Sequence, residues 1–388
     1  MTPALCRERL SSSKRRQQLS SRIYACVVVS LTDRLEQLRQ RIEEIDNGIM
    51  RLIAERIEIG REIGRIKLEN AMPLRNKEIE EKVISRYINW ASKIGISENS
   101  ARNLSSILIN ETIDAQYRMI KSEKSSNVLV IGGAGKMGNW LCRYLAARGH
   151  RVIIHDRIRS ELFPSVERID DVIYDMDFVI IATPISTIKN CLREIIAMKP
   201  KGVIFDISSI KAPIINSLKD AAMRGYAICS VHPMFGPNTN SIWDKNIIVC
   251  DCGSQKAVEA AIDLIGRSIT KIIKIPIEEH DRLMAYVLGM SHALNIAFIN
   301  TLTRSGYSME TLNSVASTTF SKQLATSRDV ANENAHLYFE IQHFNPYNVM
   351  ALDQLVQSLD EIKKAGLNDD RREFLNIMEK GRKYLGGA

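Results

Sequence analysis

Apolar residues in the first third of the chain recur with a helical period. Between Thr32 and Glu69 they stand mostly three, four or seven positions apart, at Leu35, Leu38, Ile42, Ile45, Ile49, Leu52, Ile59, Ile63 and Ile66. This spacing predicts a long amphipathic helix with Thr32-Asp33 as its N-cap, ended by Met72-Pro73. About 37 residues would span ~55 Å, and such a helix needs partner helices to cover its apolar stripe.

Two more helices are expected, over Asn76–Lys93 and Ser97–Lys121, with Gly95 between them. The three form an all-α module over residues 32–122, followed by a short polar linker over residues 123–127. A second copy of the long helix is the simplest cover for its stripe, which predicts a homodimer.

From residue 128 the helical period gives way to short, continuous apolar runs. They are Val128–Ile131, Arg151–His155, Phe178–Ala182, Val203–Ile207, Ala227–Val231, Asn246–Cys250 and Lys271–Ile275. Such runs alternating with helical segments predict an α/β domain with a mostly parallel sheet over residues 128–277. Residues 278–388 are helical by pattern, with helices expected over Leu283–Leu302, Met309–Val330, Val349–Ala365 and Asp369–Leu385.

The first of these strands runs into the glycine motif Gly133-Ala-Gly135-Lys-Met-Gly138, and a helix follows. Gly133 permits a tight turn, Gly135 lets backbone N–H groups approach a pyrophosphate, and Gly138 lets the helix lie close to the strand. Asp156 ends the second strand, where a carboxylate accepts from ribose hydroxyls. The motif predicts a Rossmann dinucleotide site.

The expected cofactor contacts are Gly133, Gly135, Lys136, Met137, Gly138, Asp156 and Thr183, the last at the carboxyl edge of the third strand. Asp156 favours NAD, because a 2′-phosphate would meet a carboxylate. Arg157 and Arg159 follow directly and leave NADP open.

His232 is the strongest candidate for proton transfer. It follows a buried strand at the sheet edge where cofactor and substrate meet, and Pro233 and Pro237 stiffen the segment after it. A histidine there can accept a hydroxyl proton while hydride leaves the same carbon. The alternative is a structural histidine.

Composition and charge narrow the class of protein. The net charge is +8, but residues 1–31 hold six Lys/Arg against Glu8 alone, or +5, so the rest carries only +3 and predicts no nucleic-acid face. Residues 1–31 are interpreted as a disordered extension, with a targeting peptide as the alternative. No apolar run approaches membrane-spanning length. Seven scattered cysteines indicate a reducing, cytoplasmic compartment and no metal site.

Polar residues of the helical module can be placed by geometry. Arg56 and Lys67, 11 residues apart, return to within about 20° of one face, whereas Arg39 lies about 100° off it and ~25 Å away. If all three serve one ligand, Arg39 must come from another copy of the helix. Thr112 and Gln116 share a face of the third helix. The alternative is that all of these are solvated surface residues.

The module also carries a sequence resemblance. Its motifs are Leu35-Glu-Gln-Leu-Arg-Gln-Arg-Ile-Glu-Glu-Ile-Asp46, Leu52-Ile-Ala-Glu-Arg56, Ile66-Lys67, Pro73-Leu-Arg75 and Thr112-x-x-x-Gln116. Over residues 33–121 the chain resembles the all-helical chorismate mutase family, whose site is shared across an intertwined dimer. The resemblance implies that Arg39 of the partner chain and Arg56 hold the substrate carboxylates, and that Lys67 and Gln116 hydrogen-bond the ether oxygen.

By the same resemblance Glu80 takes the ring hydroxyl and Thr112 lies beside a carboxylate. The sequence departs from the family at two positions, where Ile79 replaces an Arg and Asn76 an Asp, which changes the polar surroundings of Glu80. The implied reaction is a pericyclic rearrangement that moves no proton. Cations and an amide suit it, because the protein must hold a dianion in its reactive conformer and stabilise charge on the ether oxygen.

The remainder of the chain is similar to prephenate dehydrogenases. The motifs are Gly132-Gly-Ala-Gly-Lys-Met-Gly138, Asp206-Ile-Ser-Ser-Ile-Lys211, His232-Pro-Met-Phe-Gly-Pro237, Glu279-His-Asp281 and Ser291-His292. With the mutase-like module in front, the order resembles the bifunctional chorismate mutase–prephenate dehydrogenases of tyrosine synthesis. The implied fold is an all-α mutase module, an α/β Rossmann domain and an all-α C-terminal dimerisation domain.

This resemblance implies roles for a second set of residues. His232 deprotonates the substrate's ring hydroxyl, Ser209 and His292 line the substrate pocket, and Arg328, or else Lys322, binds the ring carboxylate. The implied substrates are chorismate and prephenate. Prephenate is oxidised with NAD and loses CO₂ on aromatisation, so no metal is needed.

Three alternatives remain open from sequence. The dehydrogenase could prefer arogenate or accept both substrates, which differ only in a keto or amino group. It could be a β-hydroxyacid-type dehydrogenase with a catalytic Lys in the helical part, which leaves the HPMFGP segment unexplained. The helical module could be an inactive dimerisation or effector-binding scaffold, with Ile79 as the sign of lost activity.

Overall fold

The computed structural model describes residues 3–239, 242–243, 245–267 and 269–386, and for residues 1–31 it describes no side chains. Backbone contacts divide the chain into two compact units, Met1–Met119 and Ile120–Ala388. The prediction of a disordered extension concerns residues 1–31, whose side chains are outside the described part of the structure.

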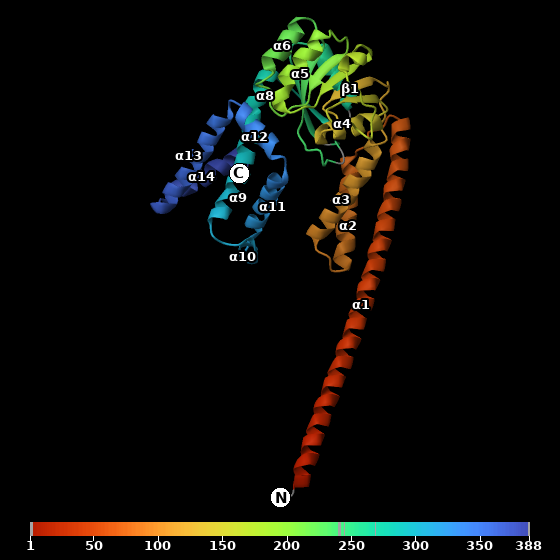
Figure 1. The fold of residues 1–388 in the computed structure, drawn as a ribbon, viewed down its shortest axis with the longest axis vertical. Helices are drawn as coiled ribbons and strands as arrows, with labels where there is room; N and C mark the ends of the chain where they lie inside the picture. The colour runs from red at the N-terminus through yellow and green to blue at the C-terminus, as the bar shows by residue number, and fades with distance from the viewer. Residues whose placement is uncertain (1–2, 240–241, 244, 268, 387–388) are drawn as a thin grey trace. The chain divides into compact units, whose positions relative to one another are not determined.

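The first unit is entirely helical (Figure 1), with α1 (Pro3–Glu69), α2 (Lys77–Lys93) and α3 (Glu98–Tyr117). The side chains of Asn76 and Ser97 cap α2 and α3 by accepting from Ile79 N and Ser100 N, because short polar side chains satisfy the free N–H groups of a first turn. The expected start of the long helix at Thr32-Asp33 is wrong, since α1 begins upstream at Pro3.

Two glycines let α1 approach α3 closely. A Cβ at Gly60 would lie 2.2 Å from Thr112 Cγ2, and one at Gly64 would lie 2.8 Å from Gln116 Cγ. Gly60 and Gly64 are four residues apart on one helix, and Thr112 and Gln116 are four apart on the other, so each pair presents one face. The glycines therefore bring the polar face of α3 against α1.

The second unit is built on a seven-stranded sheet with the order β2-β1-β3-β4-β5-β6-β7. The strands are β1 (Asn127–Ile131), β2 (Arg151–His155), β3 (Phe178–Ile181), β4 (Val203–Asp206), β5 (Ile228–Pro233), β6 (Asn246–Asp251) and β7 (Lys271–Pro276). All neighbouring pairs are parallel except β5–β6. This is the predicted Rossmann arrangement, in which the chain reverses strand order between β1 and β3.

Helices cover the sheet and complete its core. They are α4 (Lys136–Ala147), α5 (Ile185–Ala197), α6 (Ile215–Met223) and α7 (Gln255–Ile265). Strands β3, β4 and β5 are buried at every position, which is why they read in the sequence as continuous apolar runs. The predicted linker and the residue before it contact this domain, because Ser125 Oγ donates to Gly149 O (2.7 Å) and Ser122 N donates to Arg148 O (2.9 Å).

The C-terminal helices follow β7 and are drawn from cyan to blue in Figure 1. A continuous rod consists of α8 (Ile277–Met284), the π-helical turn η3 (Ala285–Met290) and α9 (Ser291–Arg304). The others are α10 (Met309–Ser314), α11 (Thr318–Asn332), α12 (Ala335–Phe344), α13 (Asn348–Leu367) and α14 (Arg371–Tyr384). The expected order along the chain, an all-α module, an α/β Rossmann domain and an all-α C-terminal domain, is confirmed.

Two details of the C-terminal prediction are wrong. The helix expected over Met309–Val330 is broken, because Ser317 caps a new helix by accepting from Phe320 N. The rod Ile277–Arg304 has 28 residues and by length and composition alone could cross a membrane. The sequence had predicted no stretch of this kind. The rod carries the buried polar residues His280 and Asp281 and packs against the sheet domain.

Candidate active sites

A first candidate site lies between α1 and α3, where the structure places the side chains of Arg56, Thr112 and Gln116. Arg56 Nη1 donates to Leu108 O (2.6 Å) and to Thr112 Oγ1. The amide of Gln116 is buried and donates to Gly60 O (2.8 Å), while its Oε1 has no partner among the described residues. Backbone carbonyl groups thus hold an arginine of α1 and an amide of α3.

Lys67 lies further along the same helix. Its Nζ donates to Leu74 O (2.6 Å), in the turn before α2. In the part of the chain that the structure describes, neither Arg56 nor Lys67 contacts a carboxylate, so both positive charges stay available to an anion. Arg39 is highly exposed and contacts only Glu36 (3.5 Å) among described residues, so one chain does not bring it to Arg56.

Glu80 is half-buried and forms a bidentate ion pair with Arg75 (2.8 and 3.0 Å). Ile79, the departure from the family pattern, is exposed, and Asn76 is engaged as the cap of α2. Arg75 therefore places a guanidinium next to Glu80, although position 79 holds Ile.

The glycine loop has the geometry that a pyrophosphate requires, with one change from the prediction. The left-handed backbone falls on Gly132 (φ +85°), one residue before the expected Gly133. A Cβ at Gly138 would lie 2.2 Å from Gly132 O, so only glycine allows α4 to sit this close. Gly135 is the N-cap of α4 without a side-chain cap, which leaves the positive end of the helix open to an anion.

A pocket of about 400 Å³ opens beside this loop. It is lined by Gly135, Lys136, Met137, Thr183 and Ser209 from the predicted set, and by residues of the HPMFGP segment. The hydroxyl of Thr183 is buried without a partner among the described residues. Asp156 lies at the end of β2 and accepts from Ala134 N (3.0 Å), which ties it to the glycine loop. An open helix end, an orphaned hydroxyl and a carboxylate at these places fit a dinucleotide.

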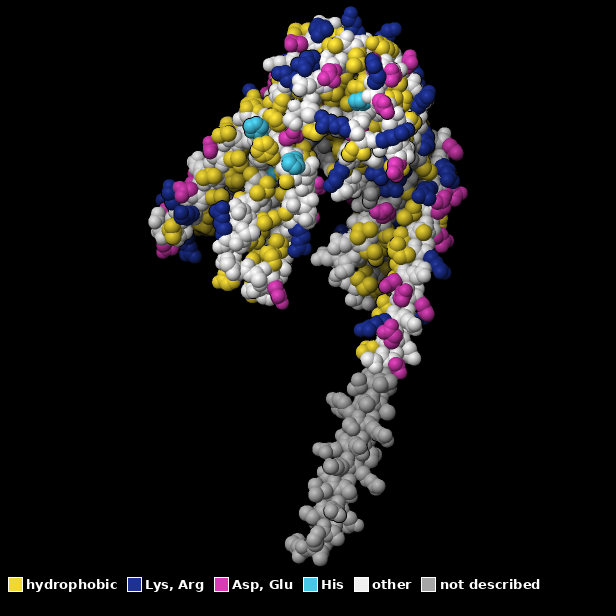
Figure 2. Space-filling view, in the orientation of Figure 1, with side chains coloured by type: hydrophobic (Ala, Val, Ile, Leu, Met, Phe, Trp, Pro, Cys, Tyr) yellow, Lys and Arg dark blue, Asp and Glu magenta, His cyan; other side chains and the backbone are white. Residues whose placement is uncertain are grey.

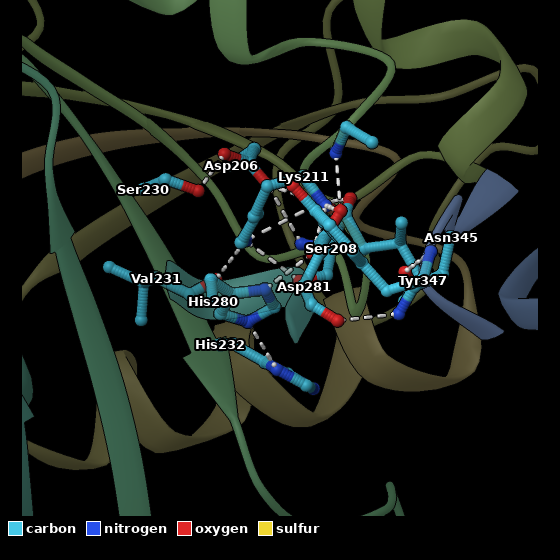
Figure 3. Close-up of polar contacts among 12 residues, drawn as sticks. Asp206, Ser208, Lys211, Ser230, Val231, His232, His280, Asp281, Asn345 and Tyr347 are labelled. Carbon is cyan, nitrogen blue, oxygen red and sulfur yellow. Dashed lines mark hydrogen bonds and ion pairs between the residues drawn. The ribbon is translucent and has the colours of Figure 1, made fainter. Parts of the chain in front are cut away.

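His232 is buried on β5 and joined to a chain of polar groups (Figure 3). Its Nδ1 lies 2.9 Å from Nε2 of His280, and Nδ1 of His280 lies 2.6 Å from Oδ1 of Asp281. Asp281 also accepts from Lys211 N (2.9 Å) and Ala212 N (2.6 Å), so its oxygens are held in place by backbone donors.

This chain fixes the tautomers of both rings. Because the carboxylate of Asp281 can only accept, Nδ1 of His280 carries a proton and Nε2 does not. Nδ1 of His232 must then donate to Nε2 of His280, and Nε2 of His232 carries the lone pair. Burial lowers the pKa of His232 well below 6.5, and the nearby His280 and Lys211 lower it further, so the ring is neutral at pH 7.

Lys211 lies near the two histidines and is fully buried. Its Nζ contacts Asp206 Oδ1 (3.0 Å), Ser208 O (2.7 Å) and Val231 O (2.9 Å) (Figure 3). Asp206 is fully satisfied as well, since Ser208 N donates to it (2.9 Å) and Ser230 Oγ donates to its other oxygen. This ion pair fixes the ends of β4 and β5, and so the position of His232.

The other predicted substrate residues lie in the C-terminal helices. His292 is half-buried at the start of α9, its ring is 4.3 Å from that of Tyr338 on α12, and its Nδ1 has no partner among the described residues. Burial lowers its pKa below 6.5. Arg328 and Lys322 are exposed on α11 and do not line the pocket, so one chain does not bring either to it.

Several site residues were not foreseen. Glu340 on α12 lines the pocket, and its carboxylate accepts from Ile185 N (3.0 Å) and Ser186 N (3.2 Å) at the start of α5. Anions are stabilised at helix N-termini, so this contact holds α12 against the Rossmann domain. Trp140 packs against Phe235 at 5.0 Å and fixes the HPMFGP segment over α4. The described residues contain no cluster of three or more potential metal ligands.

Three family models match the chain in sequence order. The chorismate mutase type II family matches residues 38–117. The nucleotide-binding domain of prephenate dehydrogenase matches residues 163–274, and the dimerization domain of prephenate dehydrogenase matches residues 276–380. The helical module and both parts of the second unit are therefore each matched.

Individual proteins agree with these families. The chain is 26% identical over 367 residues to the T-protein of Haemophilus influenzae, which covers 92% of this chain and 94% of that protein. It is 30% identical over 89 residues to the chorismate mutase of Methanocaldococcus jannaschii, or 22% of this chain and 90% of that protein. The prephenate dehydrogenase from A. aeolicus, solved with hydroxyphenyl propionate and NAD⁺, superposes with a TM-score of 0.56 at 19% identity, covering 68% of this chain and 98% of that one. At that identity the likeness concerns the fold.

Proposed function

The chain belongs to the family of bifunctional chorismate mutase–prephenate dehydrogenases, and on that premise we propose which residues perform its two reactions. The enzyme rearranges chorismate to prephenate, then oxidises and decarboxylates prephenate to 4-hydroxyphenylpyruvate with NAD, in tyrosine synthesis. The assignment of catalytic roles is carried by one observation above all, the hydrogen-bonded chain from His232 through His280 to Asp281 at the sheet edge.

In the helical module, Arg56 and the partner subunit's Arg39 bind the two carboxylates of chorismate. Lys67 and Gln116 hydrogen-bond the ether oxygen as negative charge grows on it. Arg56, Lys67 and Gln116 donate to the backbone carbonyl groups of Leu108, Leu74 and Gly60 respectively, so the donors are held in place before substrate arrives. Preorganised donors stabilise a transition state without being reoriented during the reaction.

Glu80, held by Arg75, takes the ring hydroxyl of chorismate, and Thr112 lies beside a carboxylate and orients Arg56. Ile79 therefore does not abolish the site. The Arg75–Glu80 pair supports an active mutase over the interpretation of the module as an inactive scaffold.

In the second unit, Nε2 of His232 accepts the proton of the ring hydroxyl of prephenate. NAD, when bound, accepts hydride from the carbon that bears this hydroxyl. His280 and Asp281 hold the ring of His232 in the tautomer that exposes the lone pair and stabilise the positive charge that forms on it. Ser209 and His292 contact the substrate. The resemblance assigns the ring carboxylate to a cation on α11, Arg328 or Lys322, although neither lines the pocket within one chain. Loss of CO₂ is then driven by aromatisation.

The glycine loop and Asp156 hold the cofactor. The loop residues Gly133, Gly135, Lys136, Met137 and Gly138 would hold its pyrophosphate at the start of α4, Asp156 would accept from its ribose, and Thr183 would lie at its nicotinamide end. The open N-terminus of α4 and the unpartnered hydroxyl of Thr183 support this placement. Asp156 supports NAD over NADP, since a second phosphate would meet its charge.

We further propose that the enzyme is a homodimer. Along α1 the apolar residues predicted to form the stripe are about half exposed in one chain, for example Ile42 at 58% and Ile45 at 50%, and Figure 2 shows apolar side chains on the surface of both units. Fully burying an exposed Leu or Ile side chain contributes about 1.5–3 kcal/mol, so covering these half-exposed ones contributes about half of that each, which favours pairing with a second copy. The partner's α1 would also supply Arg39 to the site.

A cytoplasmic location is proposed from the cysteines. The five that the structure describes are free thiols, four of them buried, as expected in a reducing compartment. Burial raises the pKa of Cys142 and Cys250 to about 12, so these thiols are unreactive.

The experiment that tests the assignment compares two full-length variants. His232→Asn is expected to abolish NADH formation from prephenate and to leave chorismate consumption largely intact. Lys67→Ala is expected to do the reverse. Equal loss of both activities in either variant would contradict two separate sites with these residues.

A further inference from the structure

The rod that carries His280 and His292 is not a regular α-helix. Residues Ala285–Met290 form a π-helical turn between α8 and α9, and the two histidines stand on either side of it. π-turns are rare within helices and are frequent at functional sites. Neither proton transfer nor cofactor binding, as described above, uses this turn.

The π-turn changes the direction in which His292 points. His280 and His292 are 12 residues apart, so in an uninterrupted α-helix their side chains would point about 120° apart. A π-turn inserts about one extra residue, so the 12 positions amount to about 11 α-helical steps and the two side chains return to within about 20° of one face. Met284 and Leu288, between them, lie against the core on this same face.

Side chains from α12 and α13 hold the turn at Gly289. Gln342 Nε2 donates to Gly289 O (2.8 Å), a carbonyl within the π-turn. Asn348 is buried against the same residue, and a Cβ at Gly289 would lie 2.1 Å from its Oδ1. That Oδ1 has no partner within the described part of the chain, although Nδ2 donates to Ile341 O (2.9 Å). A buried oxygen without a partner costs stability, and this one lies against the π-turn at Gly289.

We propose that the π-turn is a positioning device for substrate recognition, which turns His292 onto the face where His280 meets His232. Gly289, Gln342 and Asn348 are positioning residues that keep the turn in this form. The inference rests on the proposed contact of His292 with prephenate. It adds that this contact depends on the extra residue in the helix, and that residues outside the pocket control the affinity for prephenate.

The test uses the full-length enzyme and a double-mutant cycle. Gly289→Ala and Gln342→Leu should each raise the KM for prephenate about tenfold or more, while the Kd for NAD, measured by direct titration, stays within about twofold. Gly366→Ala on α13 is the matched control, because its Cβ would meet nothing within 4 Å, and its KM should equal that of the wild type. Gln342→Leu adds no atoms at Gly289 and carries the test if Gly289→Ala does not fold.

Adding His292→Asn to Gln342→Leu separates positioning from general damage. If Gln342 acts through His292, the double variant should have the KM of His292→Asn alone, since non-additivity marks residues acting as one unit. Unchanged KM in Gln342→Leu, or losses that multiply in the double variant, would overturn the inference while leaving the proposed function standing. An unchanged KM in His292→Asn itself would remove His292 from the proposed site, and the inference with it.

Discussion

Nδ1 of His232 lies 2.9 Å from Nε2 of His280, and this single contact decides which nitrogen of His232 can act as a base. The two rings are 48 residues apart in sequence, one at the end of β5 and the other on α8. Asp281 completes the chain by holding His280 from its other side. The arrangement positions a neutral imidazole with its lone pair on Nε2.

Replacing Asp281 by Asn should disable the base without removing it. An amide can donate to Nδ1 of His280, which reverses the tautomers of both rings and places the proton on Nε2 of His232. We expect kcat for prephenate oxidation to fall by about 10²-fold or more. Steady-state kinetics with prephenate and NAD measure this, and the mutase rate serves as internal control. A kcat within about threefold of wild type would show that the tautomer is not fixed by Asp281.

The buried pair of Lys211 and Asp206 should matter more for stability than any surface ion pair. Lys211→Met leaves a carboxylate buried without its cation, which costs about 3–5 kcal/mol. Lys219→Met breaks the exposed pair with Glu278 and should cost about 1 kcal/mol or less. Thermal unfolding of the two variants compares them. Equal shifts in Tm would mean that other groups stabilise the buried charge of Asp206 when Lys211 is absent.

The buried histidines make the protein less stable in mild acid. Burial lowers the pKa of His150, His232, His280 and His292 below their ordinary 6.5. Below pH 6.5 the unfolded chain therefore binds more protons than the folded one, and the free energy of unfolding falls as pH falls. Tm should decrease from pH 7.5 to 5.5, and less so in His150→Asn. For the same reason the acid limb of kcat/KM for prephenate should lie below pH 6.5; a limb centred above it would indicate a different base.

Because the proposed mutase site is formed by two subunits, dimers that contain two different variants can test it. Arg39→Ala and Arg56→Ala should each inactivate the mutase in homodimers. Refolding the two together should restore about one quarter of wild-type activity, because half of the dimers are mixed and each of these has one intact site. Activity that stays at the level of the separate variants would show that both arginines serve a site within one chain.

Asp156 should select the cofactor. Asp156→Ser removes the charge that a 2′-phosphate would meet but keeps an oxygen that accepts from Ala134 N. The ratio of kcat/KM for NADP to that for NAD is expected to rise by about tenfold or more. An unchanged ratio would assign the discrimination to other residues, such as Arg157.

Local motifs made much of this site visible in the sequence. The glycine loop, Asp156 and the HPMFGP segment are each contained in a few consecutive residues, and the structure places them around one pocket or beside it. The tight turn was assigned to Gly133, whereas the positive φ lies at Gly132, because three glycines among four residues offer no local sign of which one takes it.

Contacts between segments that are far apart in the sequence could not be predicted. Asp281 meets Lys211 N across 70 residues, and Glu340 meets Ser186 N across 154. Each requires the register of helices that pack onto the sheet, which no local pattern encodes. The π-turn is the same kind of feature. The side chains that contact the turn at Gly289 are those of Gln342 and Asn348, which follow it by more than fifty residues.

The most direct test of the whole account is identification of the products formed from chorismate and NAD⁺ by the wild-type enzyme and by His232→Asn. The wild type should yield 4-hydroxyphenylpyruvate, with one NADH and one CO₂ for each chorismate consumed. His232→Asn should stop at prephenate, with chorismate consumed and no NADH formed. Failure of the wild type to consume chorismate, or NADH formation by His232→Asn at the wild-type rate, would contradict two successive reactions in one chain with His232 as the base of the second.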